Sequence, residues 1–167
     1  MIDRRTFVSL MLGTLTMPVA LTACGSSSDE PAASESQTQI ANPFVDCESA
    51  SEAAQLAGFE VTFPESVPGC SERLYQAVEG EMVQCIYSSG DTEVLIRKGM
   101  GTDDISGDYT DYGEVNTVDV AGTEVTEKGE DGLVFAATWV RDGFAFAIDA
   151  NEGLDAETIG HLAQATL

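Results

Sequence analysis

Two alternating apolar runs separated by an Asp-Gly pair, within residues 133–149, constrain the fold more than any other feature of the sequence. Asp142-Gly143 is a strong signal for a two-residue hairpin turn, because both central positions of that turn need a positive φ. A turn centred there pairs Trp139 with Phe146, so both strands place large apolar side chains on one face. The residues predicted to share that face are Phe135, Ala137 and Trp139 on the first strand and Phe144, Phe146 and Ile148 on the second. The sequence therefore predicts an antiparallel hairpin with one aromatic-rich core face.

Alternating patterns with turn residues between them predict further strands upstream of this hairpin. Their ranges are 59–63, 72–78, 82–88, 92–98, 114–120 and 123–128. The intervening turns are expected at Glu79-Gly80, near Gly90-Asp91 and at Ala121-Gly122. The stretch 99–113 is rich in polar residues and is predicted to be a loop. In this register Cys85 shares a face with Val94 and Ile96.

Two helices are predicted, one before most of the strands and one after them. Ser49 and Glu52 form a capping-box pattern, and Gly58 provides a C-terminal cap. The apolar stripe of this first helix is made of Ala50, Ala53, Ala54 and Ala57. Asp155 is a good N-cap for the second helix, with a possible hydrophobic staple between Leu154 and Ile159. The apolar face of that helix consists of Ile159, Leu162, Ala163 and Thr166.

These elements define the fold class as α+β. We expect a curved, mostly antiparallel sheet of seven or eight strands, with an N-terminal and a C-terminal helix packed on one face. Residues 42–167 are predicted to form this single globular domain. The hydrophobic content of the chain, 43%, is sufficient for a packed core.

Residues 1–23 have the features of a lipoprotein signal peptide. Arg4 and Arg5 precede an apolar run that ends in Leu21-Thr22-Ala23-Cys24, which resembles the bacterial lipobox. A cysteine is required there because its thiol forms the thioether to diacylglycerol. The start Asp3-Arg4-Arg5-Thr6-Phe7-Val8 resembles a twin-arginine motif, and an ordinary Sec signal is the alternative. We expect Cys24 to carry acyl chains such as palmitate, and residues 24–41, rich in Ser, Ala and acidic groups, to be a flexible tether.

The acidity of the chain restricts its partners. It has 29 acidic and 7 basic side chains, a net charge of −22. Without residues 1–23 the counts are 28 and 5, so the charge of the exported part becomes −23. This charge argues against nucleic-acid binding, which needs a basic surface, and against electrostatic docking on anionic lipid. Attachment to the extracytoplasmic face of the cell membrane would then depend on the lipid anchor.

His161 is the only histidine, and it lies near the edge of the apolar stripe of the C-terminal helix. We interpret it as a surface residue rather than a catalytic base, because no nucleophile motif accompanies it. A single histidine also argues against a zinc site, and we expect no cofactor. The many carboxylates provide possible acid/base pairs, but nothing in the sequence brings two of them together. No catalytic residue is therefore assigned.

The loop 99–113 concentrates carboxylates at Asp103, Asp104, Asp108 and Asp111. Oxygen-rich loops bind calcium, so these four residues are a candidate calcium site. Their spacing does not match an EF-hand, and a solvated acidic loop is the default interpretation. A third interpretation is that the loop, with Tyr109 and Tyr112, forms the rim of a binding cleft.

Lipidation of Cys24 leaves three cysteines in the exported domain, which permits one disulfide and one free thiol. Cys70 and Cys85 share a face of the predicted hairpin but lie about four positions out of register. We hypothesise a disulfide between Cys47 and Cys70, with Cys85 buried as a small apolar side chain. Three free thiols are the alternative.

Several short motifs resemble an uncharacterised domain-of-unknown-function family of exported lipoproteins from Gram-positive bacteria. They are Asn42-Pro43-Phe44, Ser51-Glu52-Ala53-Ala54 with Ala57-Gly58-Phe59, Ile96-Arg97-Lys98, Asp104-Ile105-Ser106-Gly107-Asp108-Tyr109 and Ala137-Thr138-Trp139. The resemblance spans residues 42–167. It implies an exported lipoprotein with these domain limits and assigns no activity, and Cys70 and Cys85 are not part of the pattern.

The sequence thus favours a membrane-anchored extracytoplasmic lipoprotein that acts as a binding or interaction module. Its sheet face or loop 99–113 would contact a small ligand, a cell-wall component or a protein partner. One alternative is a cell-envelope hydrolase that uses carboxylates, which a cleft with two carboxylates and a raised pKa would favour. Another is a sensor or inhibitor subunit of a membrane protein, which an exposed apolar patch would favour.

Overall fold

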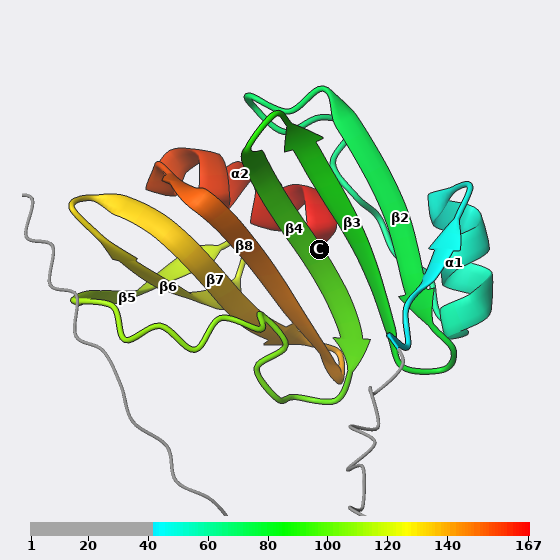
Figure 1. Cartoon of the computed structure of the whole chain (residues 1–167). Helices are drawn as coiled ribbons and strands as arrows, with labels where there is room; N and C mark the ends of the chain where they lie inside the picture. The colour runs from blue at the N-terminus through cyan, green and yellow to red at the C-terminus, as the bar shows by residue number, and fades with distance from the viewer. Residues whose placement is uncertain (1–41) are drawn as a thin grey trace, which may run out of the picture. The chain divides into compact units, whose positions relative to one another are not determined.

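The computed structural model describes residues 42–167, which form an α+β domain with one open antiparallel sheet (Figure 1). The eight strands lie in the order β1-β2-β3-β4-β8-β7-β6-β5. In chain order the elements are β1 (Val45–Cys47), α1 (Ala50–Ala57), β2 (Glu72–Val78), β3 (Met82–Ser89), β4 (Thr92–Met100), β5 (Glu114–Val120), β6 (Thr123–Glu130), β7 (Leu133–Arg141), β8 (Phe144–Leu154) and α2 (Ala156–Thr166). The predicted fold class is confirmed. The predicted signal peptide, the lipidated Cys24 and the tether lie outside the described residues.

The predicted hairpin between β7 and β8 is confirmed in turn and register. Asp142 and Gly143 have φ values of 52° and 81°, as a type I′ turn requires. Trp139 is opposite Phe146, and the two rings stack at 5.3 Å between centroids. The same pair of positive φ values occurs at Ala121-Gly122 and Asp131-Gly132, so the chain from β5 to β8 consists of tight hairpins.

The alternating pattern places one face of the sheet in the core. Cys85 is opposite Ile96, and both are fully buried on this face, as predicted. The C-terminal helix α2 packs here with Ile159, Leu162, Ala163 and Thr166 buried, and it lies behind the sheet in Figure 1. The smaller α1 covers a second cluster on the same face, with Ala53 against Ala77 and Val83. Both helices therefore lie on one face, and we call the opposite one the open face.

Both helices begin and end as their capping residues predict. Ser49 Oγ accepts a hydrogen bond from the Glu52 backbone N–H at 3.2 Å, and Gly58 ends α1 with φ 81°. Asp155 Oδ1 accepts from the Thr158 N–H at 2.8 Å at the start of α2. These side chains satisfy N–H groups that have no partner within a helix.

The predicted strand 59–63 is wrong, and the short strand β1 was not predicted. The alternating residues Phe59, Val61 and Phe63 do pack against the cluster beneath α1. Their backbone, however, pairs with no strand, and the carbonyl of Glu60 accepts from Lys98 Nζ at 2.7 Å instead. The ammonium group of Lys98 also lies over the rings of three phenylalanines, with Phe144 at 4.3 Å. The alternation thus reports burial of one side of the segment rather than strand pairing.

The predicted placement of Phe135 with Ala137 and Trp139 is also wrong. The register of β7 against β8 shifts between Val134 and Ala136, so Val134 takes the core position. Phe135 stacks instead on Tyr112 of the loop, at 5.6 Å between ring centroids. The register changes by three residues at this irregularity, from Ala136 opposite Asp149 to Val134 opposite Leu154, so the alternation of β7 does not continue to Phe135.

The hypothesised Cys47–Cys70 disulfide is absent: Cys47, Cys70 and Cys85 are free thiols in the structure. Cys47 lies opposite Tyr75 and belongs to the cluster beneath α1, whereas Cys70 packs against the larger cluster beneath α2. Cys85 is a buried apolar residue, as predicted, and burial raises the pKa of its thiol to about 11.

Candidate functional site

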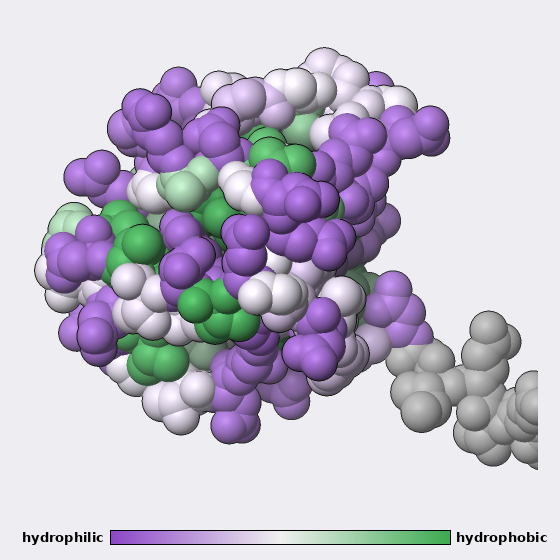
Figure 2. All heavy atoms as spheres, turned by 90° about the vertical axis from the view of Figure 1, so that its left-hand side faces the viewer, coloured by the Kyte–Doolittle hydropathy of each residue, from purple (hydrophilic) through white to green (hydrophobic). Residues whose placement is uncertain are grey.

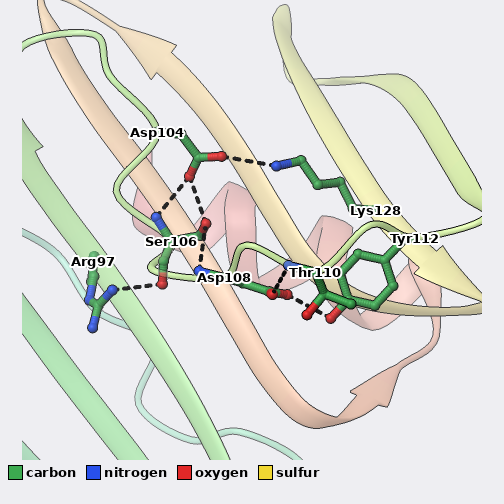
Figure 3. Close-up of polar contacts among 7 residues, drawn as sticks. All are labelled: Arg97, Asp104, Ser106, Asp108, Thr110, Tyr112 and Lys128. Carbon is green, nitrogen blue, oxygen red and sulfur yellow. Dashed lines mark hydrogen bonds and ion pairs between the residues drawn. The ribbon is translucent and has the colours of Figure 1, made fainter.

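Residues 101–113 form an ordered loop that crosses the open face of the sheet (Figure 3). Arg97 of β4 holds it there. Its Nη1 donates to the backbone carbonyls of Ile105 at 2.9 Å and Ser106 at 2.6 Å. Gly107 passes so close that a Cβ at this position would lie 2.8 Å from Arg97 Nη1. The loop is thus fixed by the side chain of a neighbouring strand.

Arg97 is itself oriented by a row of polar side chains across four strands. Its Nε donates to Gln84 Oε1 at 2.9 Å. Gln84 Nε2 in turn donates to Gln76, and Gln76 Nε2 donates to Asp46 at 2.6 Å. These four residues are opposite one another in consecutive strands. Burial lowers the pKa of Arg97 somewhat, whereas the nearby Asp149 carboxylate favours the charged guanidinium.

Two carboxylates of the loop are engaged in local hydrogen bonds. Asp104 Oδ1 accepts from the Ser106 N–H and hydroxyl, and its Oδ2 pairs with Lys128 Nζ at 2.9 Å. Asp108 accepts from the Thr110 N–H at 2.8 Å and from the Tyr112 hydroxyl at 2.6 Å. Burial opposes ionisation at both sites, but these hydrogen bonds outweigh it, so both pKa values lie below the ordinary range for aspartate.

An open groove of about 650 Å³ lies where this loop begins. We call it the Trp139 groove. Its walls come from residues 102–104 of the loop, residues 121–124 at the turn between β5 and β6, and residues 138–141 at the end of β7. Trp139, 4% exposed, forms part of the wall, and its indole N–H has no hydrogen-bond partner among the described residues. A buried donor without a partner costs about 1–3 kcal/mol, so such a group calls for an explanation.

A second, smaller hollow of about 310 Å³ lies further along the loop, at Gly107, Asp108 and Tyr112. It contains Asp108, Tyr112 and Asp149, and we call it the Asp149 hollow. Burial raises the pKa of Asp149, and the negative charge of Asp108 adds to this effect while Arg97 opposes it. Two carboxyl groups in one hollow therefore have pKa values shifted in opposite directions.

Two of the four residues of the candidate calcium site, Asp104 and Asp108, already accept hydrogen bonds from protein groups. The carboxylate of Asp104 contacts Ser106 and Lys128, and that of Asp108 contacts Thr110 and Tyr112. Within residues 42–167, no group of three or more His, Cys, Asp or Glu side chains is arranged to hold a metal ion. Asp103 lines the Trp139 groove. Tyr112 lines the Asp149 hollow, and Tyr109 borders a further hollow beside Lys128.

His161 is exposed, as predicted for a surface residue. Its Nε2 lies 3.7 Å from Glu157 Oε1, one helical turn away on the exposed side of α2. The side chain also borders a hollow formed with Pro64, Val67 and Leu162.

The residues that build the site were only partly identified from the sequence. The acidic loop was recognised, but the partners that hold it, Arg97, Gln84 and Lys128, were not. Gln84 lies in β3 and Lys128 in β6, whereas Arg97 lies in β4, the strand that leads into the loop. The available signal was Arg97 itself, a basic residue directly after the apolar run Val94-Leu95-Ile96 of a predicted strand, because a buried cation needs a partner.

No family model, curated protein or solved structure matches this chain. The resemblance to exported lipoproteins therefore stays a prediction. Within the described domain, neither helix is long and apolar enough to cross a membrane.

Proposed function

We propose that this chain is a lipid-anchored, extracytoplasmic binding module and that the Trp139 groove is its ligand site. The expected signal peptide and Cys24 support the location. The observation that carries the ligand site is the groove itself, an open space of about 650 Å³ bordered by Trp139 and four threonines. The volume of the groove also falls in the range of small-molecule sites, about 300–1,000 Å³.

The lining of the groove favours a ligand rich in hydroxyl groups. Hydroxyl groups come from Thr102, Thr123, Thr126 and Thr138, and carboxylates from Asp103, Asp104 and Glu124. Carboxylates accept hydrogen bonds from ligand hydroxyls, and threonines both donate and accept. Three carboxylates against the single cation Arg141 disfavour an anionic ligand. A segment of a cell-envelope glycan has the required chemistry.

Because Trp139 is the only tryptophan, its fluorescence reports directly on the groove. We expect chitotetraose, an N-acetylglucosamine oligomer, to produce a saturable fluorescence change in the mature chain purified in detergent. Thr138→Val keeps the shape of the groove and removes one hydroxyl. This change should weaken binding about three- to tenfold, the effect of one hydrogen bond.

Thr117→Val is the matched control, because Thr117 lies on the same face of the sheet in β5 but outside the groove. The Thr117→Val variant should bind chitotetraose with the same affinity as the unmodified chain. Absence of any fluorescence response at millimolar chitotetraose, or equal losses in the two variants, would refute the glycan-binding site.

The alternative of a cell-envelope hydrolase is favoured by one observation, the opposite pKa shifts in the Asp149 hollow. In glycoside hydrolysis a protonated carboxyl group donates a proton to the leaving oxygen while an ionised one acts as base or nucleophile. Asp149 has the raised pKa of the acid, and Asp108 the lowered pKa of the ionised partner. The aromatic ring of Tyr112 lies beside them.

On this alternative the chain should solubilise isolated peptidoglycan, and Asp149→Asn should abolish the release of reducing sugar. The rate should rise with pH as Asp108 ionises and fall again as Asp149 loses its proton. Asp119→Asn, an exposed site on β5, provides a matched control with unchanged activity. No release of reducing sugar by the unmodified chain at any pH would eliminate the hydrolase.

A further inference from the structure

The two edges of the sheet are built differently. The β1 edge has only three residues, and short edge strands offer little to pair with. The β5 edge has seven residues, Glu114–Val120, with an unbroken register against β6 and no proline. Residues 114–117 are all exposed, and Val115 is 61% exposed. The β5 edge thus lacks most of the features by which proteins protect an edge strand.

The register shows which backbone groups of β5 are free. Val120 and Thr123 flank the two-residue turn and therefore form a hydrogen-bonded pair. Hydrogen-bonded pairs alternate with non-bonded ones along an antiparallel ladder. The N–H and C=O groups of Val115, Thr117 and Asp119 consequently point away from β6. No described residue forms a backbone hydrogen bond with them outside the ladder.

The charge of this edge distinguishes between possible partners. Asp119 is directly opposite Glu124, both are exposed, and neither is in an ion pair with another described residue. Like charges directly opposite each other are destabilising, and a cation placed between them relieves the repulsion. β5 itself contains no basic residue. Residues 42–167 carry 25 acidic and five basic side chains, so two copies of the domain repel each other.

We propose that the β5 edge binds an extended, lysine- or arginine-containing segment of a partner protein, which adds to the sheet as a further strand. Main-chain hydrogen bonds to Val115, Thr117 and Asp119 supply affinity, as in other cases of strand addition. Basic side chains of the segment lie beside Asp119 and Glu124 and supply specificity. The net charge disfavours pairing of the same edge with a second copy.

The location of this edge suits a partner that approaches from outside. The described chain begins at Asn42, next to β1, and β1 and β5 are the two ends of the strand order. Seven steps between neighbouring strands amount to about 34 Å along the sheet. The β5 edge is therefore the part of the sheet farthest from the side on which the chain enters the domain. Figure 2 shows this side of the molecule, where hydrophilic residues surround small separate apolar patches.

Thr117→Pro tests the proposal. It removes an outward-facing N–H while the hydrogen bonds between β5 and β6 stay intact, and proline is tolerated on edge strands. The probe is a seven-residue peptide that alternates lysine with valine, titrated calorimetrically into the mature chain. We expect saturable binding that Thr117→Pro weakens at least tenfold and that Thr117→Val leaves unchanged. Circular dichroism establishes that both variants are folded.

Asp119→Asn tests the charge without relying on proline. Its side-chain oxygen still accepts from the Gly122 N–H, as Asp119 does at 3.1 Å. We expect about a two- to fivefold loss of peptide affinity, in the range for an exposed ion pair. No saturable binding of the peptide, or binding that neither variant weakens, overturns the proposal. A dimer in sedimentation that Thr117→Pro dissociates would assign the edge to a second copy instead. The edge and the Trp139 groove are tested by different probes, so either proposal can fail alone.

Discussion

Gly129→Ala is expected to destabilise the domain by at least about 3 kcal/mol, or to prevent folding, since overpacking against rigid backbone is among the most costly substitutions. Gly129 lies at the shift of register between β6 and β7, and it is buried. A Cβ there would overlap the backbone carbonyl oxygen of Leu133 and lie 3.1 Å from Val134 Cα. Neither neighbour is the end of a flexible side chain, so the strands themselves must separate.

Urea denaturation followed by circular dichroism measures this effect. Gly160→Ala is the matched control, because a Cβ on Gly160 in α2 has no neighbour within 4 Å. That variant should be stabilised by up to about 1 kcal/mol through helix propensity. If Gly129→Ala instead keeps the unfolding midpoint of the unmodified chain, β6 and β7 do not approach each other as described.

Local patterns in the sequence predicted the hairpins and helix ends because the forces that determine them act between near neighbours. An Asp-Gly pair adopts positive φ at low cost, and alternation then fixes the register of Trp139 against Phe146. Ser49 and Asp155 satisfy N–H groups only three residues away. The failures at 59–63 and Phe135 have a common cause. Alternation records which side chains are buried, and it carries no information on backbone pairing or on a change of register.

The candidate site was less predictable because it depends on contacts between distant segments. The loop sequence revealed its acidity but not that Arg97 would hold two of its carbonyls. Nor does any local pattern place β4 beside β8, the pairing that joins strands β1–β4 to strands β5–β8 in one sheet. The unpaired indole of Trp139 became apparent only after the surrounding side chains were in place.

Arg97→Ala is expected to cost about 3 kcal/mol of folding stability. The substitution removes three hydrogen bonds from a charged donor, and it leaves the carbonyls of Ile105 and Ser106 without their partner. Each charge-assisted hydrogen bond contributes about 1.5–3 kcal/mol, and water that enters the vacated space recovers part of that sum. Urea denaturation measures the loss. Arg141→Ala removes an exposed arginine whose nearest carboxylate is 3.6 Å away, and should change stability by less than about 0.5 kcal/mol.

The same substitution also tests whether the loop and the Trp139 groove are coupled. Residues 102–104 form one wall of the groove, and Arg97 fixes the chain only one residue further on. Amide hydrogens of residues 104–108 should therefore exchange much faster in Arg97→Ala, while those of β7 and β8 keep their protection relative to global unfolding. Chitotetraose affinity should fall along with loop protection. Arg97→Lys keeps the positive charge but lacks the planar guanidinium group that donates to Gln84 and to both carbonyls. Its amide exchange and its glycan affinity should therefore lie between those of the unmodified chain and Arg97→Ala. Fast exchange in the loop with undiminished glycan affinity would mean that the wall formed by residues 102–104 contributes nothing to binding, and the groove would then depend on β6 and β7 alone.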